Sequence, residues 1–85
     1  MFLARIYVTM KPGVNDPQGQ TIQDALLQLG FNTVRDVRAG KYMEVKLDEH
    51  SAELASQRIV EICDKLLANP IIENYHFELE RTSEN

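Results

Sequence analysis

Hydrophobic residues alternate with polar ones in three stretches of the chain, and this period of two predicts β-strands. The stretches are residues 3–10, 33–47 and 70–79. The middle stretch predicts a hairpin that turns near Gly40, because glycine permits the positive φ of a tight turn. Its first arm is irregular, since Val34 and Val37 lie three positions apart and share a strand face only if a bulge intervenes.

Two stretches with a period of 3.6 predict helices between the strands. Asp16 caps the first helix, Pro17 occupies its first turn and Gly30 ends it. Gly19 weakens the helix propensity of that turn, so we expect another backbone to come close to it. Ser51 caps the second helix, which ends before an Asn-Pro pair. The apolar stripes are Ile22, Ala25, Leu26 and Leu29 in the first helix and Ala52, Ala55, Ile59, Ile62, Cys63 and Leu66 in the second.

The resulting order of elements, β-α-β-β-α-β, predicts an α+β fold of the ferredoxin-like kind. This is a two-layer sandwich in which a four-stranded antiparallel sheet carries two helices on one face. Residues 1–80 are expected to form a single domain, and residues 81–85 a polar C-terminal tail. A chain of 85 residues buries only about 60–65% of its unfolded surface, so association with further chains would add stability.

The sheet face without helices is expected to carry polar and aromatic side chains. It allows three interpretations: a solvated face, a subunit interface or an RNA-binding face. We favour the interface and assign Tyr7 and Tyr42 to self-association, because tyrosine and arginine are enriched at interfaces. The same tyrosines occupy strand positions that stack on bases in RNA-binding domains. The expected face comprises Arg5, Tyr7, Thr9, Asp36, Arg38, Tyr42, Glu44, Lys46, Asn74, His76 and Glu78.

Composition and charge oppose several function classes. Nine basic and thirteen acidic residues give a net charge of −4, which disfavours a binder of nucleic-acid phosphates. The longest apolar runs are far shorter than the about 20 residues of a membrane span, and the N-terminus lacks the features of a signal peptide. The single cysteine excludes an internal disulfide and fits a reducing compartment. We therefore expect a cytoplasmic protein without a nucleic-acid or membrane partner.

Catalytic templates also fail along the sequence. Cys63 lies on an apolar helix stripe, where cysteine is usually a small core residue, and His50 and His76 do not have the spacing of metal ligands. No nucleophile elbow or phosphate-binding loop is present, and the carboxylates are scattered. We expect no catalytic, cofactor-binding or metal-binding residue in this chain.

The connection between the first strand and the first helix, residues 11–19, contains two prolines and two glycines. It is either a rigid structural connection or a stiff recognition loop that loses little entropy when a partner binds. Its composition does not choose between the two.

The same connection belongs to a set of short stretches that occur together, in this order, over nearly the whole chain. They are Tyr7-Val8-Thr9-Met10-Lys11-Pro12-Gly13-Val14 with Asp16-Pro17-Gln18-Gly19, Ala25-Leu26 with Leu29-Gly30, Val37-Arg38 with Gly40-Lys41, and Leu66-Leu67-Ala68-Asn69-Pro70 with Ile72-Glu73 and Tyr75. In this combination the chain resembles PurS, the family of small subunits of phosphoribosylformylglycinamidine (FGAM) synthase.

The resemblance implies the fold predicted above and a non-catalytic accessory subunit of a ligase. The parent enzyme converts formylglycinamide ribonucleotide, glutamine and ATP into formylglycinamidine ribonucleotide in the fourth step of de novo purine biosynthesis. Its implied partners are the synthetase subunit PurL and the glutaminase subunit PurQ, which this chain would bridge while it assists ammonia transfer. The resemblance further implies a homodimer or tetramer. ATP, Mg and glutamine would be used by the assembled complex, which is therefore ATP-binding and nucleotide-binding, and not by cofactor sites of this subunit.

Loop character and the match to the family motifs together suggest which residues contact these partners. We assign partner contacts to Lys11, Pro12, Gly13, Asp16, Pro17, Gly19, Arg38, Gly40 and Lys41. The alternative function is a stand-alone ferredoxin-like regulatory domain that binds a small ligand at a dimer interface.

Overall fold

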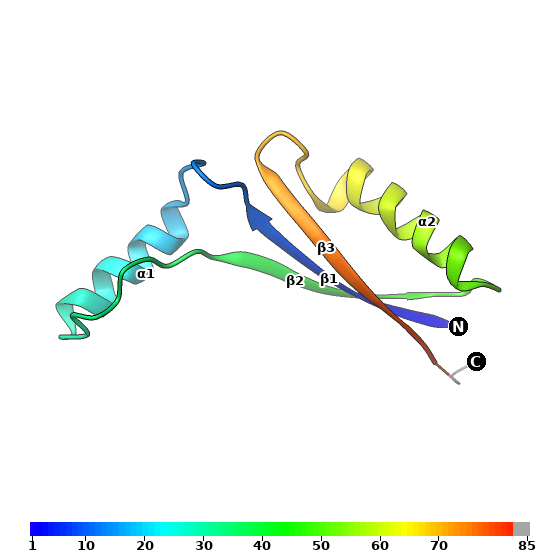
Figure 1. Ribbon diagram of the computed structural model, residues 1–85, viewed down its shortest axis with the longest axis horizontal. Helices are drawn as coiled ribbons and strands as arrows, with labels where there is room; N and C mark the ends of the chain where they lie inside the picture. The colour runs from blue at the N-terminus through cyan, green and yellow to red at the C-terminus, as the bar shows by residue number, and fades with distance from the viewer. Residues whose placement is uncertain (83–85) are drawn as a thin grey trace.

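Three strands form one antiparallel sheet in the part of the chain that the computed structural model describes, residues 1–82 (Figure 1). The sheet order is β2-β1-β3. Helix α1 lies at one end of the long axis, whereas α2 and a short π-helical continuation, η1, lie above the strands. The elements are β1 (Phe2–Met10), α1 (Pro17–Gln28), β2 (Gly40–Leu47), α2 (Ala52–Ile62), η1 (Cys63–Leu67) and β3 (Glu73–Arg81).

Strand β1 occupies the centre of the sheet, and its alternation determines both faces. Ala4, Ile6 and Val8 are at most 1% exposed and point to the side of α2. On the opposite face, Tyr7 pairs with Tyr42 of β2 and with His76 of β3. The predicted assignment of β1 and β2 side chains to the two faces is therefore confirmed.

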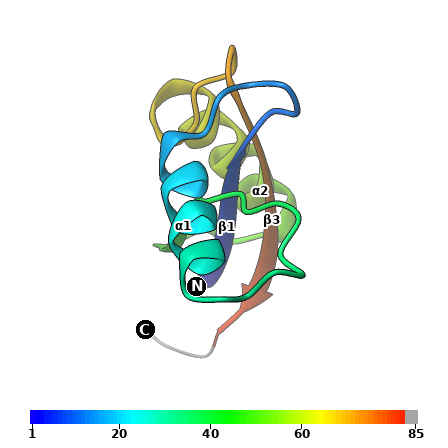
Figure 2. The same ribbon diagram turned by 90° about the vertical axis from the view of Figure 1, so that its left-hand side faces the viewer.

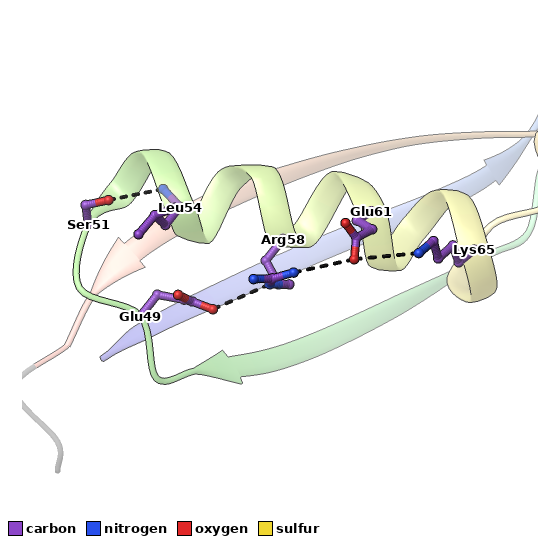
Figure 3. A network of polar contacts seen from close by, with 6 residues as sticks. All are labelled: Glu49, Ser51, Leu54, Arg58, Glu61 and Lys65. Atoms are coloured by element: carbon purple, nitrogen blue, oxygen red, sulfur yellow. Dashed lines mark hydrogen bonds and ion pairs between the residues drawn. The ribbon is translucent and has the colours of Figure 1, made fainter.

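Helix α2 covers this buried face. Ala55, Ile59 and Cys63 are fully buried against β1, as their stripe predicted. The Ser51 hydroxyl caps the helix by accepting a hydrogen bond from the Leu54 amide at 3.1 Å (Figure 3). Two of the predicted stripe residues are exceptions. Ala52 is exposed in the first turn of the helix, and the π-helical turn leaves the Leu66 side chain 80% exposed. The core of the described residues thus lies between one helix and one sheet face.

The prediction of a four-stranded sheet was wrong. Residues 31–39, which include the expected first arm of the hairpin, form no strand and lead from α1 back to β2. The side chains of Asp16 and Arg38 bind backbone groups of this segment and of the loop before α1, in place of a strand ladder. Asp36 and Arg38 consequently do not belong to the open sheet face.

The expected position of α1 over its own sheet was also wrong. The helix projects from the end of the sheet, on the same side of the strands as α2, and the molecule measures 51 × 28 × 15 Å (Figure 2). Gly19 is the only buried residue of α1, and its predicted apolar stripe is open. The end of the helix agrees with the prediction, since Gly30 adopts a φ of +96°.

The last strand begins at Glu73, three residues later than predicted, because residues 69–72 form a turn in which the Asn69 carbonyl accepts from the Glu73 amide at 2.7 Å. It continues through Arg81, one residue into the segment expected to be a tail. Residues 83–85 of that expected tail lie outside the described residues.

Candidate functional site

The two connections that join α1 to the sheet, residues 11–19 and 37–41, meet at the root of the helix, and we call them the α1 base. All nine predicted partner-contact residues lie in it. Asp16 links the two connections, because one carboxylate oxygen accepts from the Gly19 amide at 2.9 Å and the other from the Ala39 amide at 2.7 Å. The residue predicted as a helix cap therefore also fixes the return of the chain from α1.

The Asp16 carboxyl is 7% exposed and carries its charge readily in this position. The hydrogen bonds from Gly19 and then from Ala39 lower its pKa below the ordinary value of an aspartate, despite its burial. A carboxyl with a lowered pKa in the folded state stabilises that state above the unfolded pKa of about 3.9 and loses this effect as the pH falls further.

We therefore expect acid to loosen the α1 base. The effect begins below the unfolded pKa of about 3.9 and is complete only when the pH has fallen through the lowered pKa of the folded carboxyl. Protonation of Asp16 then removes the acceptor of two backbone amides, so the Gly19 and Ala39 amides exchange faster with solvent. Hydrogen exchange as a function of pH, corrected for the intrinsic exchange rate, measures this effect. In Asp16→Asn the protection of these two amides should be weak at neutral pH and nearly independent of pH. Unchanged protection in wild type as the pH falls from 6 to about 2, well below the unfolded pKa of about 3.9, would contradict the assignment.

Arg38 is a second link between the two connections of the α1 base. Its guanidinium donates to the Lys11 carbonyl at 3.2 Å and to the Val14 carbonyl at 3.1 Å. The same loop turns at Gly13, whose φ is +85°, and the Lys11 amide donates to the Ile72 carbonyl at 2.9 Å. Arg38 is thus a structural residue whose guanidinium already serves two carbonyl groups.

Gly19 and Gly40 are required by close approach of the backbone. A Cβ at Gly19 would collide with the Val37 carbonyl oxygen and lie 2.7 Å from a carboxylate oxygen of Asp16. A Cβ at Gly40 would collide with the Val8 carbonyl oxygen. The expectation that a second backbone passes close to Gly19 is confirmed.

A cavity of about 430 Å³ opens beside the α1 base, on the side of the sheet that carries α2. Val8 and Met10 line one part of it, and Asp16, Lys41 and Glu73 supply its charges. The Lys41 ammonium lies 3.6 Å from a Glu73 carboxylate oxygen and 3.4 Å from the Leu67 carbonyl. The Lys41 ammonium of β2 therefore contacts both β3 and the end of η1.

The nine predicted contact residues divide into two groups. Asp16, Gly19, Arg38 and Gly40 hold the α1 base together through the contacts given above. The other residues make none of these contacts through their side chains: Pro12, Gly13, Pro17 and Lys41 are exposed, as are Arg38 and Gly40 of the first group, and Lys11 is half-buried.

The two tyrosines assigned to self-association form a row across the open face with a third ring. The Tyr7 ring lies 5.1 Å from that of Tyr42 and stacks on His76 at 4.6 Å. Burial and a hydrogen bond to Glu78 raise the pKa of Tyr7, and a hydrogen bond to Glu44, together with burial, raises the pKa of Tyr42. His76 was not among the predicted site residues, although its position opposite Tyr7 follows from the strand register.

Cys63, the remaining reactive group considered from the sequence, is fully buried under α2, and this burial raises the pKa of its thiol. Within residues 1–82 no group of three His, Cys, Asp or Glu side chains is arranged to hold a metal ion. Nor does this part of the chain include a helix long and apolar enough to cross a membrane.

Comparison with known proteins identifies the family. A family model described as "PurS: Phosphoribosylformylglycinamidine (FGAM) synthase" matches residues 3–81. The chain belongs to the PurS family. Among its PurS relatives, the FGAM synthase subunit PurS of Synechocystis is 51% identical over 88% of this chain and 75% of the relative. The Bacillus subtilis PurS subunit is 44% identical over 94% of both chains.

Solved PurS structures share the fold of this chain over a length that includes α1. PurS of Methanocaldococcus jannaschii, described as one of the subunits of formylglycinamide ribonucleotide amidotransferase, superposes with a TM-score of 0.86 at 38% identity, over 98% of this chain and all of the other. A chain of "PurLQS from Thermotoga maritima" superposes with a TM-score of 0.82 at 26% identity, over 94% and 99%. The single-chain architecture therefore agrees broadly with a ferredoxin-like fold, and it corrects both the predicted number of strands and the predicted position of α1.

Proposed function

We propose that this PurS chain is a non-catalytic subunit of FGAM synthase that bridges the synthetase subunit PurL and the glutaminase subunit PurQ and assists the transfer of ammonia between them. The observation that carries the proposal is the likeness to PurS in the Thermotoga maritima PurLQS structure, over nearly the whole length of both chains. The family match over residues 3–81 supports the same assignment.

The shape of the chain fits a bridging role. It presents the exposed loop of the α1 base at one end of the sheet and the row of Tyr42, Tyr7 and His76 on the open face. A rigid loop loses little entropy on binding, and aromatic rings supply apolar area with a polar edge. We assign contacts with PurL or PurQ to the α1 base, above all to its exposed residues Pro12, Gly13 and Lys41.

Self-association completes the proposal. The chain acts as a homodimer or as a tetramer of paired dimers in the cytoplasm, and Tyr7 and Tyr42 belong to a contact between copies. ATP, Mg and glutamine are bound by the other subunits of the complex, and nucleotide binding is not assigned to any residue of this chain. A stand-alone regulatory domain is not favoured, because relatives named as synthase subunits match 88% and 94% of this chain.

Reconstitution tests the proposal. Purified PurL and PurQ from the same source are expected to form FGAM from glutamine and ATP only after this chain is added, with a rise of at least tenfold in rate. With ammonium salt as the nitrogen source, PurL alone should react, and the added chain should change that rate by less than about twofold, because no ammonia has to move between subunits.

The two nitrogen sources separate the possible failures. If glutamine-dependent synthesis proceeds equally well without the chain, the accessory role is wrong. If the chain raises the ammonium-dependent rate to the same extent, it acts on the PurL reaction itself, and the bridging role is wrong. An assembled complex in size-exclusion chromatography supplies the accompanying measurement of binding.

A further inference from the structure

Strand β3 forms an unprotected edge of the sheet. Within residues 1–82 it pairs with β1 alone, in an unbroken register from Glu73 to Arg81. Natural proteins blunt such edges with lysine, proline, bulges or short strands. Strand β3 has nine residues without lysine, proline or a break in its register, whereas the opposite edge strand, β2, carries Lys41 and Lys46. A long and continuous edge of this kind is able to accept a further strand.

Two hydrogen bonds next to the ladder show which backbone groups of β3 point outward. The Lys11 amide donates to the Ile72 carbonyl and the Thr82 amide donates to the Met1 carbonyl, each at 2.9 Å. Both pairs continue the register of β1 with β3, and hydrogen-bonded pairs alternate with non-bonded ones in an antiparallel ladder. The even-numbered residues of β3 therefore bond to β1, and the odd-numbered residues direct their amides and carbonyls to the open edge. The outward-facing residues in the middle of the strand are Tyr75, Phe77 and Leu79.

The same three residues carry the apolar side chains of β3. These side chains lie on the side of α2 and are only half-buried against the core. Val60 of α2 is 41% exposed, one helical turn before Asp64, which accepts a hydrogen bond from the Tyr75 hydroxyl. A strand added at this edge would cover the apolar row of β3 while it pairs with the backbone. Backbone pairing and apolar burial thus favour the same occupant.

Carboxylates surround the open edge. Asp64 and Glu78 accept hydrogen bonds from neutral tyrosine hydroxyls at 3.3 and 3.2 Å, which leave their negative charges in place. Glu53 lies three helical turns before Asp64, on the same flank of α2. The basic residue of β3, Arg81, lies over the Phe2 ring of β1 at 4.7 Å. The edge therefore carries an excess of negative charge.

The opposite flank of α2 has its charges balanced. Figure 3 shows Arg58 between Glu49 and Glu61, with Lys65 next to Glu61, in ion pairs of 3.5 to 3.7 Å on the side of β2. The unbalanced charge is thus confined to the side of β3. A second copy would bring the same negative excess to this edge and be repelled, whereas a basic segment would be attracted.

We propose that the β3 edge binds an extended, basic segment of another FGAM synthase subunit, which adds to the sheet as a fourth strand. The proposal rests on the bridging role proposed above and extends it. A chain that joins PurL to PurQ needs two surfaces, and the α1 base is one of them. The β3 edge is the second, and it holds the subunit that the α1 base does not.

The edge specifies the chemistry of the segment that it binds. Side chains alternate between the two faces of a strand, so apolar residues at every second position would cover the apolar row of β3. Basic side chains next to these would reach Asp64 on the helix side and Glu78 on the open face. The segment is therefore a strand with alternating apolar residues and at least two lysine or arginine residues.

Proline at position 79 tests the backbone contact, because the Leu79 amide points outward and its loss leaves the ladder with β1 intact. Leu79→Ala is the matched control, since it removes the same side chain and keeps the amide. The measurement is the chain concentration that gives half of the maximal glutamine-dependent FGAM synthesis by PurL and PurQ. We expect Leu79→Pro to require at least ten times the concentration that Leu79→Ala requires. Tyr75→Pro with Tyr75→Ala repeats the comparison if circular dichroism shows that Leu79→Pro does not fold.

The charge of the edge is tested on the two flanks of α2. Glu53→Gln combined with Asp64→Asn should raise the required concentration at least threefold, because it removes charge next to β3 and keeps a hydrogen-bond acceptor for Tyr75. Glu49→Gln combined with Glu61→Gln, on the side of β2, is the control and should change it less than twofold. Equal effects of the two pairs would overturn the choice of a basic segment.

Hydrogen exchange of the assembled complex locates the occupant. The amides of Tyr75, Phe77 and Leu79 should exchange rapidly in the free chain and at least tenfold more slowly after assembly, together with one segment of PurL or PurQ. Slow exchange already in the free chain would mean that a second copy fills the edge, and it would overturn the proposal. If the wild-type chain does not stimulate synthesis, the accessory role is wrong and this proposal with it. If it does, and Leu79→Pro acts as well as Leu79→Ala, only the proposal for β3 is wrong.

Discussion

Replacement of Gly19 by alanine is expected to lower the free energy of unfolding by about 1–3 kcal/mol and to detach α1 from its fixed orientation. In an open helix the same change would stabilise by about 1 kcal/mol, because alanine has the higher helix propensity. Here the new methyl group would collide with the Val37 carbonyl oxygen and crowd the Asp16 carboxylate. The sign of the effect therefore distinguishes a packed helix root from an ordinary first turn.

Urea unfolding of Gly19→Ala and wild type, followed by circular dichroism at equal chain concentration, measures this difference. Gln20→Ala is the matched control, since Gln20 is exposed in the same turn and its change should stay within about 0.5 kcal/mol. Faster exchange of the Ala39 amide in Gly19→Ala would locate the damage at the α1 base. A stabilised Gly19→Ala protein would show that Val37 moves away easily and that the base is not rigid.

The elements that could be predicted from the sequence are those whose signals are local. Alternation identified β1 and β2, and cap chemistry identified the starts of both helices at Asp16 and Ser51. These features depend on neighbours a few residues away, so they can be recognised from short stretches of the sequence. The same holds for Gly30 at the end of α1.

The location of α1 could not be predicted for a physical reason. Its stripe of Ile22, Leu26 and Leu29 shows that one side of the helix must be buried, but amphipathicity does not specify whether its own sheet or another chain covers it. The assumption of a complete single-chain sandwich therefore placed the helix on the wrong surface. The same assumption led to the prediction of a fourth strand in residues 31–39. Hydrogen bonds of the Asp16 and Arg38 side chains, and not pairing with another strand, hold the end of that segment.

The candidate site, too, was predictable from the sequence only in part. Motif and loop composition selected residues that do lie together at the α1 base, although they are up to thirty positions apart in sequence. Composition did not indicate that the Arg38 guanidinium binds the Lys11 and Val14 carbonyls, since backbone acceptors leave no mark in a sequence. The predicted set of partner contacts consequently includes residues that support the α1 base from within, such as Asp16 and Gly19.

Truncation of Ile59 to alanine should lower the free energy of unfolding by about 2–5 kcal/mol. Ile59 and Cys63 are the largest fully buried residues that the helical layer supplies, and the loss leaves a cavity above β1. A chain of this size has a total stability near the lower end of about 5–15 kcal/mol. A large fraction of Ile59→Ala is therefore expected to be unfolded at 37 °C.

Val60→Ala provides the comparison, because Val60 is the next residue of the same helix and is 41% exposed. Its effect should stay below about 1 kcal/mol. If the chain self-associates as proposed, a tenfold rise in concentration of Ile59→Ala should raise its melting temperature, since association stabilises only the folded chain. Equal losses in the two variants would mean that α2 does not provide the core, and a melting temperature independent of concentration would place all of the stability within one chain.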